Sequence, residues 1–187
     1  EPATLLSASI TVNSPVRCNG NTDGILTANG AGGISPYTYA WSNSSTFKTI
    51  LNIPAGSYTV TITDANNCSK TDQVTLVSPS AIVPVASVVS NVSCFGLSDG
   101  EATVTATGGT PGYTYSWSNS ATTALISGLS AGTYTVTATD INNCQETTTI
   151  TITEPAELTT SIINSTAPTC FGGADATAEA SPLGGTS

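Results

Sequence analysis

The chain repeats itself with a period of 76 residues. Cysteine, tryptophan, tyrosine and aspartate recur at this spacing, most clearly at Cys18, Cys94 and Cys170. Such a period means that one supersecondary unit is used several times along the chain. We predict a first repeat unit at residues 1–80, a second at 81–156 and the N-terminal part of a truncated third at 157–187.

Within each repeat, apolar residues alternate with threonine, which is the period-two pattern of half-buried strands. In the second repeat this alternation predicts strands at 99–107, 113–118, 122–127 and 132–140. No helical periodicity of useful length is present, so we predict an all-β fold of tandem immunoglobulin-like antiparallel β-sandwich repeats. The aromatic residues at strand positions are expected in the cores: Trp41, Trp117, Tyr58 and Tyr134. The two tyrosines also stand where sandwich domains place a corner tyrosine that binds backbone.

The cysteines recur in a way that favours disulfides. Four predicted strands separate the two cysteines of each repeat, and four reversals would return the chain to the end where it started. We therefore predict the bonds Cys18–Cys68 and Cys94–Cys144, with Cys170 unpaired. Closing a loop of about 50 residues is worth roughly 4 kcal/mol in the loop-closure model, which would help a thin core. The alternative is free buried thiols in a reducing cytosol.

Candidate ligand sites are weak. The aspartate and asparagine of the Asp-x-Asn-Asn segments are calcium candidates, namely Asp64, Asn66, Asp140 and Asn142. Such side chains more commonly cap tight turns by binding their own backbone. With no histidine in the chain, a neutral-pH catalyst would lack its commonest proton shuttle and metal ligand. We predict no catalytic residue, no enzymatic activity and no cofactor.

Charge and hydropathy exclude several partners. The chain carries 12 Asp and Glu against 3 Lys and Arg, a net charge of -9. This balance provides no basic patch for nucleic acid and repels anionic membrane surfaces. No stretch approaches 18 continuous apolar residues, so no membrane span is expected. The opening stretch does not have the pattern of a signal peptide, so a signal would lie outside this sequence.

Three motifs together carry a family resemblance. Their second copies begin at Cys94-Phe95-Gly96, Gly108-Gly109-Thr110-Pro111 and Leu129-Ser130-Ala131-Gly132. Taken with their spacing, they resemble the SprB-type repeat of large cell-surface adhesins of gliding bacteria, exported by the type IX secretion system. The resemblance implies an extracellular protein of the cell surface, without catalytic residues. It also implies partners: neighbouring repeats of the same chain, the secretion and gliding machinery, and an extracellular surface or polysaccharide.

Two functions follow from this resemblance. The repeats are expected to form an elongated stalk or spacer in surface adhesion and gliding motility. Alternatively, the repeats themselves bind surface glycans or act as calcium-stiffened binding modules. The largest difference between the copies, Phe47-Lys48 against Thr123-Ala124, is modest, which favours the spacer.

The final segment presents a separate problem. Residues 157–187 should form two strands, near 158–164 and 175–180, without the core residues of a complete repeat. An isolated strand pair is marginal in water. We expect either that further strands of a longer chain complete this unit, or that the pair adds to an exposed sheet edge.

Overall fold

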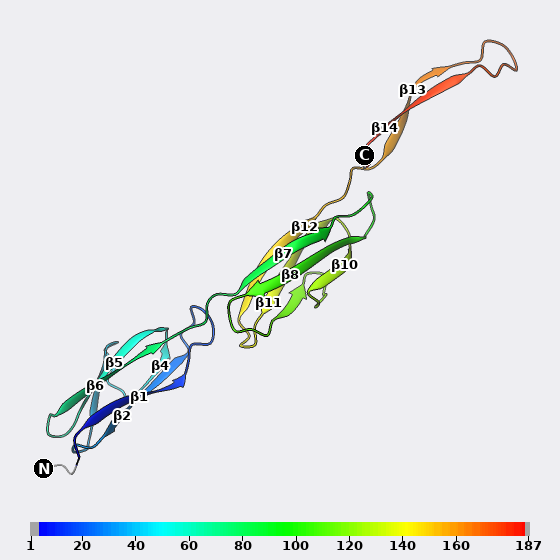
Figure 1. Cartoon of the computed structure of the whole chain (residues 1–187). Helices are drawn as coiled ribbons and strands as arrows, with labels where there is room; N and C mark the ends of the chain where they lie inside the picture. Colours follow the sequence, from blue (N-terminus) through cyan, green and yellow to red (C-terminus); the bar gives the residue numbers. More distant parts are fainter. Residues whose placement is uncertain (1–3, 186–187) are drawn as a thin grey trace. The chain divides into compact units, whose positions relative to one another are not determined.

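The computed structural model describes residues 4–185, in which every regular element is a β-strand (Figure 1). The first repeat contains β1 Ser7–Ser14, β2 Gly24–Ala31, β3 Thr38–Trp41, β4 Thr49–Ile53, β5 Gly56–Thr63 and β6 Ser69–Leu76. The second contains β7 Val83–Ser90, β8 Gly100–Thr107, β9 Thr114–Trp117, β10 Leu125–Leu129, β11 Gly132–Thr139 and β12 Gln145–Ile152. Two strands follow, β13 Thr159–Thr166 and β14 Thr177–Leu183. The predicted all-β fold is confirmed, and the strands lie where the alternation places them.

Each repeat folds as two three-stranded sheets. In the first, the strand orders are β1-β2-β4 and β3-β5-β6; in the second they are β10-β8-β7 and β12-β11-β9. Apolar positions of both sheets meet in one core per repeat. The first core contains Leu26, Trp41, Val60, Ile62 and Leu76, and the second contains Val104, Trp117, Leu129, Val136 and Ile152. The alternation of buried and exposed positions is what a two-layer sandwich requires.

Strands β3 and β4 belong to different sheets but run in the same direction. β4 pairs antiparallel with β2, and β3 pairs antiparallel with β5. β2 and β5 are themselves co-directional, because Gly24 at the start of β2 lies against Leu76, which pairs with Gly56 at the start of β5. The chain therefore crosses from one sheet to the other between β3 and β4 without reversing.

This crossing places the two ends of the first repeat at opposite ends of the sandwich. Strand β2 runs from the end near Cys18 to the far end, β3 and β4 together run back, and β5 returns to the far end, where Cys68 lies. At that far end, the N–H of Gly33 donates to the carbonyl oxygen of Thr4 at 3.0 Å. The repeat thus begins at the Cys68 end and finishes at the Cys18 end.

Grouped by proximity, the chain forms two compact units. The first comprises the residues up to Val83 together with the loops Thr107–Gly112 and Thr139–Cys144. The second comprises Pro84–Ala106, Tyr113–Ala138 and the residues from Gln145 onward. The domain boundaries predicted at 80/81 and 156/157 stay a prediction.

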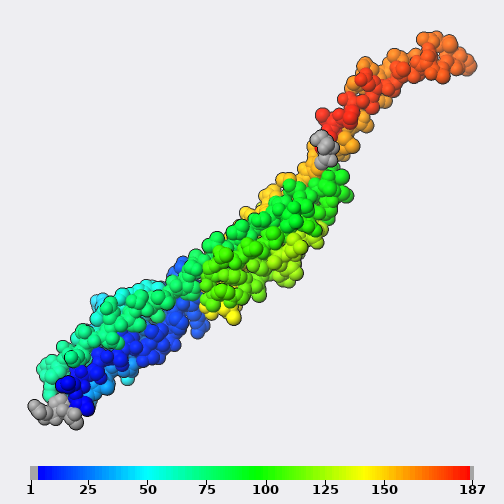
Figure 2. All heavy atoms as spheres, in the orientation of Figure 1, coloured from blue at the N-terminus to red at the C-terminus, as the bar shows by residue number. Residues whose placement is uncertain are grey.

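The final two strands pair with each other from Thr159–Leu183 to Thr166–Thr177. All of β13 is exposed, including Ile162 and Ile163, so the predicted lack of a core holds. Figure 2 shows this segment, in orange and red, as a narrow ribbon of atoms without a covering layer. Within the described residues, β13 and β14 form a separate two-stranded sheet, so addition to another sheet edge is not seen.

Candidate functional site

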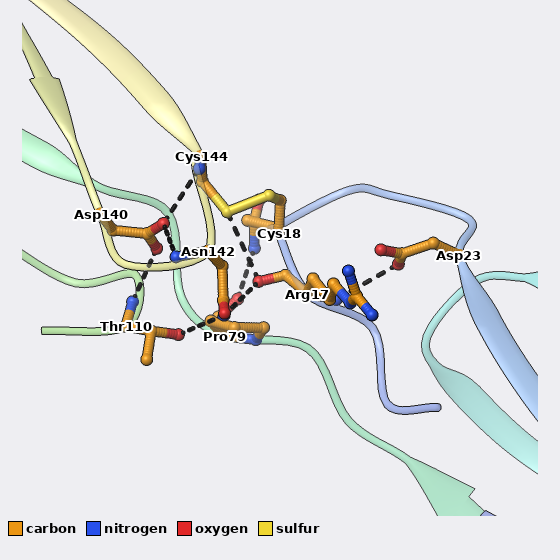
Figure 3. Close-up of a disulfide and its surroundings, with 9 residues drawn as sticks. Arg17, Cys18, Asp23, Pro79, Thr110, Asp140, Asn142 and Cys144 are labelled. Carbon is orange, nitrogen blue, oxygen red and sulfur yellow. Dashed lines mark hydrogen bonds between the residues drawn. A yellow bond between two sulfur atoms is a disulfide. The ribbon is translucent and has the colours of Figure 1, made fainter. Parts of the chain in front are cut away.

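A disulfide joins Cys18 to Cys144 across 126 residues of sequence (Figure 3). The Cα atoms of the two cysteines are 5.6 Å apart, within the usual range for a disulfide. Cys18 lies in the loop between β1 and β2, residues 17–23, which we term the Cys18 loop. Cys144 ends the hairpin loop between β11 and β12, residues 140–144, which we term the Asp140 loop. Both loops belong to the first compact unit.

This bond replaces the predicted pairing. The predicted bonds Cys18–Cys68 and Cys94–Cys144 are not formed, and Cys68, Cys94 and Cys170 are exposed free thiols. The physical reason is that β3 and β4 run in the same direction, whereas the prediction treats them as two opposed strands. With only three traverses between them, the cysteines of one repeat lie about one eight-residue strand apart, roughly 25 Å.

Asp140 organises the loop that carries Cys144. Its carboxylate accepts three backbone N–H groups, each at 2.9 Å: those of Thr110, Asn142 and Cys144. The side chain is only 3% exposed. Burial alone would raise the pKa of this carboxyl, but the three N–H donors stabilise the anion and hold its pKa below the ordinary value. The charged carboxylate of Asp140 therefore stabilises the turn that holds the sulfur of Cys144 in place.

Asn142 links the Asp140 loop to the Cys18 loop. Its Nδ2 donates to Thr110 Oγ1 at 2.9 Å and to the carbonyl oxygen of Arg17 at 3.3 Å (Figure 3). The Sγ of Cys144 lies 3.5 Å from the same carbonyl, a contact without a hydrogen bond because a disulfide sulfur carries no proton. The covalent bond is thus accompanied by a specific polar contact.

The Cys18 loop has its own internal support. The N–H of Arg17 donates to Asp23 Oδ1 at 3.2 Å, and the N–H of Asn21 donates to the carbonyl oxygen of Cys18 at 3.1 Å. Asn19 Nδ2 reaches the carbonyl oxygen of Pro79 at 3.1 Å. Together these bonds fix the direction in which Cys18 presents its sulfur.

A family model for the SprB repeat matches residues 9–46 and 86–122. The SprB repeat model thus matches the chain twice, once in each 76-residue repeat. No curated protein sequence matches closely enough to count as a relative. Residues 4–185 include no helix that could cross a bilayer.

Solved structures resemble the two SprB repeats in fold. The three N-terminal domains of the Highly Immunogenic Outer Capsid protein (Hoc) of bacteriophage RB49 align with 97% of this chain and 71% of their own, at 19% identity and a TM-score of 0.51. A C-terminal 282-residue fragment of intimin, solved with the intimin-binding domain of its translocated receptor, aligns with 84% of this chain and 67% of its own, at 14% identity and a TM-score of 0.42. At 19% identity the likeness to Hoc concerns the fold alone.

Both 76-residue repeats show the same tyrosine hydrogen bond. The hydroxyl of Tyr58 donates to the carbonyl oxygen of Pro54 at 2.8 Å, and that of Tyr134 donates to Ser130 at 3.0 Å. This is the corner-tyrosine arrangement of sandwich domains. Trp41, Trp117 and Tyr58 are buried, whereas Tyr134 is half-buried. Burial raises the pKa of the Tyr58 hydroxyl.

The two aspartates among the calcium candidates, Asp64 and Asp140, accept hydrogen bonds from backbone N–H groups. Asp64 in the first repeat accepts the N–H groups of Ile34 at 3.1 Å and of Asn66 and Cys68 at 2.9 Å each. The hydrogen bond from Ile34 contributes most to holding the pKa of Asp64 below its ordinary value. Burial of the carboxyl acts against it, and the bonds from Cys68 and Asn66 act with it. Because N–H donors already face the oxygens of Asp64 and Asp140, the geometry is that of a turn cap. Within residues 4–185, no cluster of three or more metal-ligating side chains occurs.

Sequence reasoning missed the contribution of Arg17 and Thr110 to the linkage. The Arg17 contribution is a backbone carbonyl, which a side-chain pattern cannot reveal. Thr110 stands where the first repeat has Ile34, so the first repeat lacks the hydroxyl that holds Asn142 in the second. That difference between copies was the available signal.

Proposed function

We propose that this chain is a non-enzymatic segment of an extracellular cell-surface adhesin, and that its SprB repeats form an extended stalk in adhesion and gliding motility. The family resemblance supports export by type IX secretion and action with the gliding machinery on an external surface or polysaccharide. The disulfide supports an oxidising location outside the cytosol. Neighbouring repeats of the same chain are the immediate partners.

The observation that carries this proposal is the closure of 126 residues by the Cys18–Cys144 bond. When the chain is pulled from its two ends, tension passes from Cys18 directly to Cys144 through the disulfide. The residues between them, which include nearly all the strands of both repeats, carry none of the load. A stalk that transmits force between a cell and its substratum needs this property.

Single-molecule force spectroscopy tests the load path. Pulled from its ends under oxidising conditions, the chain should extend without releasing the residues between Cys18 and Cys144. Adding a reductant should release about 126 residues, a gain on the order of 400 Å in contour length. Complete extension before reduction would remove the support that the disulfide gives to a load-bearing role.

One surface feature favours direct glycan binding as a second candidate. Phe47 is 74% exposed and, with Lys48 and Leu51, lines a shallow depression in the first repeat. An exposed aromatic face beside polar groups is able to stack on a sugar ring. The second repeat has Thr123 and Ala124 at the equivalent positions, so only one copy offers this surface.

A competition assay separates the two candidates. The isolated chain is added in excess to cells that carry the adhesin, and attachment to a polysaccharide surface is counted. A spacer leaves attachment unchanged, whereas a binding repeat inhibits it. The double variant Phe47→Thr and Lys48→Ala, which copies the second repeat, should abolish any inhibition that depends on the depression.

A further inference from the structure

Cys68 and Cys94 occupy the repeat positions of the two bonded cysteines. Cys68 is equivalent to Cys144, and Cys94 is equivalent to Cys18, each displaced by 76 residues. Both carry exposed free thiols. The chain therefore contains one formed disulfide and, at the repeat positions of its two partners, two free cysteines.

The loop that carries Cys68 has the same aspartate hydrogen bonds as the Asp140 loop. Asp64 is 5% exposed, and its Oδ1 accepts the N–H groups of Asn66 and Cys68 at 2.9 Å each. These are the distances from Asp140 to Asn142 and Cys144 in the bonded loop. The following asparagine also has a positive φ in both copies, 64° at Asn67 and 63° at Asn143. The Cys68 loop thus has the aspartate-to-backbone hydrogen bonds of the bonded loop, although Ile34 replaces the Thr110 hydroxyl that holds Asn142.

The loop that carries Cys94 likewise has the backbone hydrogen bonds of the Cys18 loop. The N–H of Ser93 donates to Asp99 Oδ1 at 3.0 Å, and the N–H of Leu97 donates to the carbonyl oxygen of Cys94 at 3.1 Å. The matching bonds around Cys18 measure 3.2 and 3.1 Å. Ser93 occupies the repeat position of Arg17, whose carbonyl oxygen accepts the hydrogen bond from Asn142.

A partner within the same repeat is out of reach for either thiol. Cys94 precedes β8 and Cys144 follows β11, as Cys18 precedes β2 and Cys68 follows β5. In the first repeat these two places lie at opposite ends of the sandwich, about a strand length apart. A disulfide at Cys68 or Cys94 would therefore require a cysteine of another repeat.

We propose that Cys94 is a covalent docking site for the Asp-x-Asn-Asn-Cys loop of the next complete repeat, and that Cys68 is the matching site for the Cys18-type loop of a preceding one. Each bond would join cysteines 126 residues apart. Two thiols form one disulfide and release two protons and two electrons, which a small disulfide oxidant such as oxidised glutathione accepts to become two thiols. This inference rests on the observed bond and not on the adhesin role.

Successive bonds of this kind overlap. A bond from Cys94 would close residues 94–220, which share their first 51 positions with the stretch closed by Cys18 and Cys144. Residues 94–144 would then lie inside two covalent loops. Cutting the Cys94 bond would leave these residues inside the loop closed by Cys18 and Cys144.

The test completes the third repeat. The full 187-residue chain is extended by a second copy of residues 112–156, in register because Ser187 occupies the repeat position of Pro111. The appended copy of Cys144 then falls 126 residues after Cys94. After oxidation with a glutathione buffer, free thiols are alkylated, and acid peptic peptides are mapped without reduction.

We expect two bonds in this extended chain, Cys18–Cys144 and Cys94 to the appended cysteine. Alkylation of Cys94 should fall from complete in the original chain to the background level of Cys18. Cys68 and Cys170 should remain fully alkylated, because each would need a further repeat. The Cys18–Cys144 bond serves as the internal control for oxidation.

A second variant guards against misfolding of the composite third repeat. Here residues 157–187 are replaced by a complete second copy of residues 81–156, so that the third repeat is identical to the second. The same Cys94 bond is expected. Alkylated Cys94 in this variant, or its bond to Cys144 or to the copy of Cys94, would overturn the proposal.

Discussion

The indole Nε1 of Trp41 donates a hydrogen bond of 2.9 Å to the carbonyl oxygen of Phe47. Trp117 makes the equivalent bond to Thr123 at 3.0 Å. In each repeat the bond spans the segment that carries the chain from one sheet to the other. Because that segment crosses without reversing, the two cysteines of a repeat end at opposite ends of the sandwich.

Replacing this indole should destabilise the first repeat. Trp41→Phe keeps an aromatic ring but leaves the Phe47 carbonyl without its donor, which costs about 1–3 kcal/mol. Urea unfolding followed by circular dichroism measures the change. Tyr39→Phe, which retains a ring on the same strand, serves as the control and should cost less than Trp41→Phe. Equal effects of the two changes would contradict a role for the indole hydrogen bond.

Much of the fold could be predicted from the sequence. Alternation with threonine located strands such as Gly132–Thr139, because a half-buried sheet imposes a period of two on its side chains. The same alternation says nothing about which sheet a strand joins. The turn after Trp117 was predicted as a reversal, but it transfers the chain between sheets, with Ser120 at a φ of 69°.

The disulfide pairing depended on that one distinction. If Thr114–Trp117 and Leu125–Leu129 are taken as opposed strands, the chain crosses the sandwich an even number of times between the two cysteines of a repeat, and a bond within the repeat is predicted. Because they run in the same direction, the number of crossings is odd and that bond cannot form. The Asx turns at Asp64 and Asp140 were predictable, because their chemistry is local. The partner of Cys144 was not, because it depends on the direction of four strands.

Removing the disulfide should lower the stability of the chain. In the loop-closure model, a bond across 126 residues is worth about 5 kcal/mol, an upper figure for Cys18→Ser. Cys68→Ser changes an exposed free thiol of the same kind and should be nearly neutral. Thermal unfolding of both variants by calorimetry makes the comparison. Equal destabilisation by the two serines would contradict the observed connectivity.

Gly24 should tolerate no side chain. A Cβ at this position would lie 2.8 Å from the carbonyl oxygen of Ile53 and would also overlap the Leu76 side chain. We expect Gly24→Ala to cost about 1–3 kcal/mol through overpacking. Gly56→Ala is the matched control, since its Cβ would meet only Tyr58 at 3.8 Å. Denaturant midpoints of the two variants should therefore separate clearly, and coincident midpoints would refute the close approach.

Stability should decrease in acid. Hydrogen bonds hold the pKa values of Asp64, Asp99 and Asp140 below the ordinary aspartate value. A lowered native pKa contributes stability that is complete above the unfolded pKa and is lost as pH falls through the native one. The urea midpoint should thus be level near neutral pH and fall below about pH 4.

Asp140→Asn tests the source of this decrease. An amide cannot reproduce a carboxylate that accepts three N–H groups, so the variant should be less stable at neutral pH and its midpoint should fall less in acid. Glu146→Gln, at an exposed position on β12, should leave the profile unchanged. An Asp140→Asn profile parallel to that of the original chain would show that this carboxylate does not contribute.

The most direct test of the account is the connectivity of the cysteines in the oxidised chain. Free thiols are alkylated at low pH, and peptic peptides are then identified by mass spectrometry without reduction. The account predicts one linked pair, Cys18 with Cys144, and alkylated Cys68, Cys94 and Cys170. Linked pairs Cys18–Cys68 and Cys94–Cys144 would contradict it, because they require the cysteines of each repeat to lie at the same end of the sandwich.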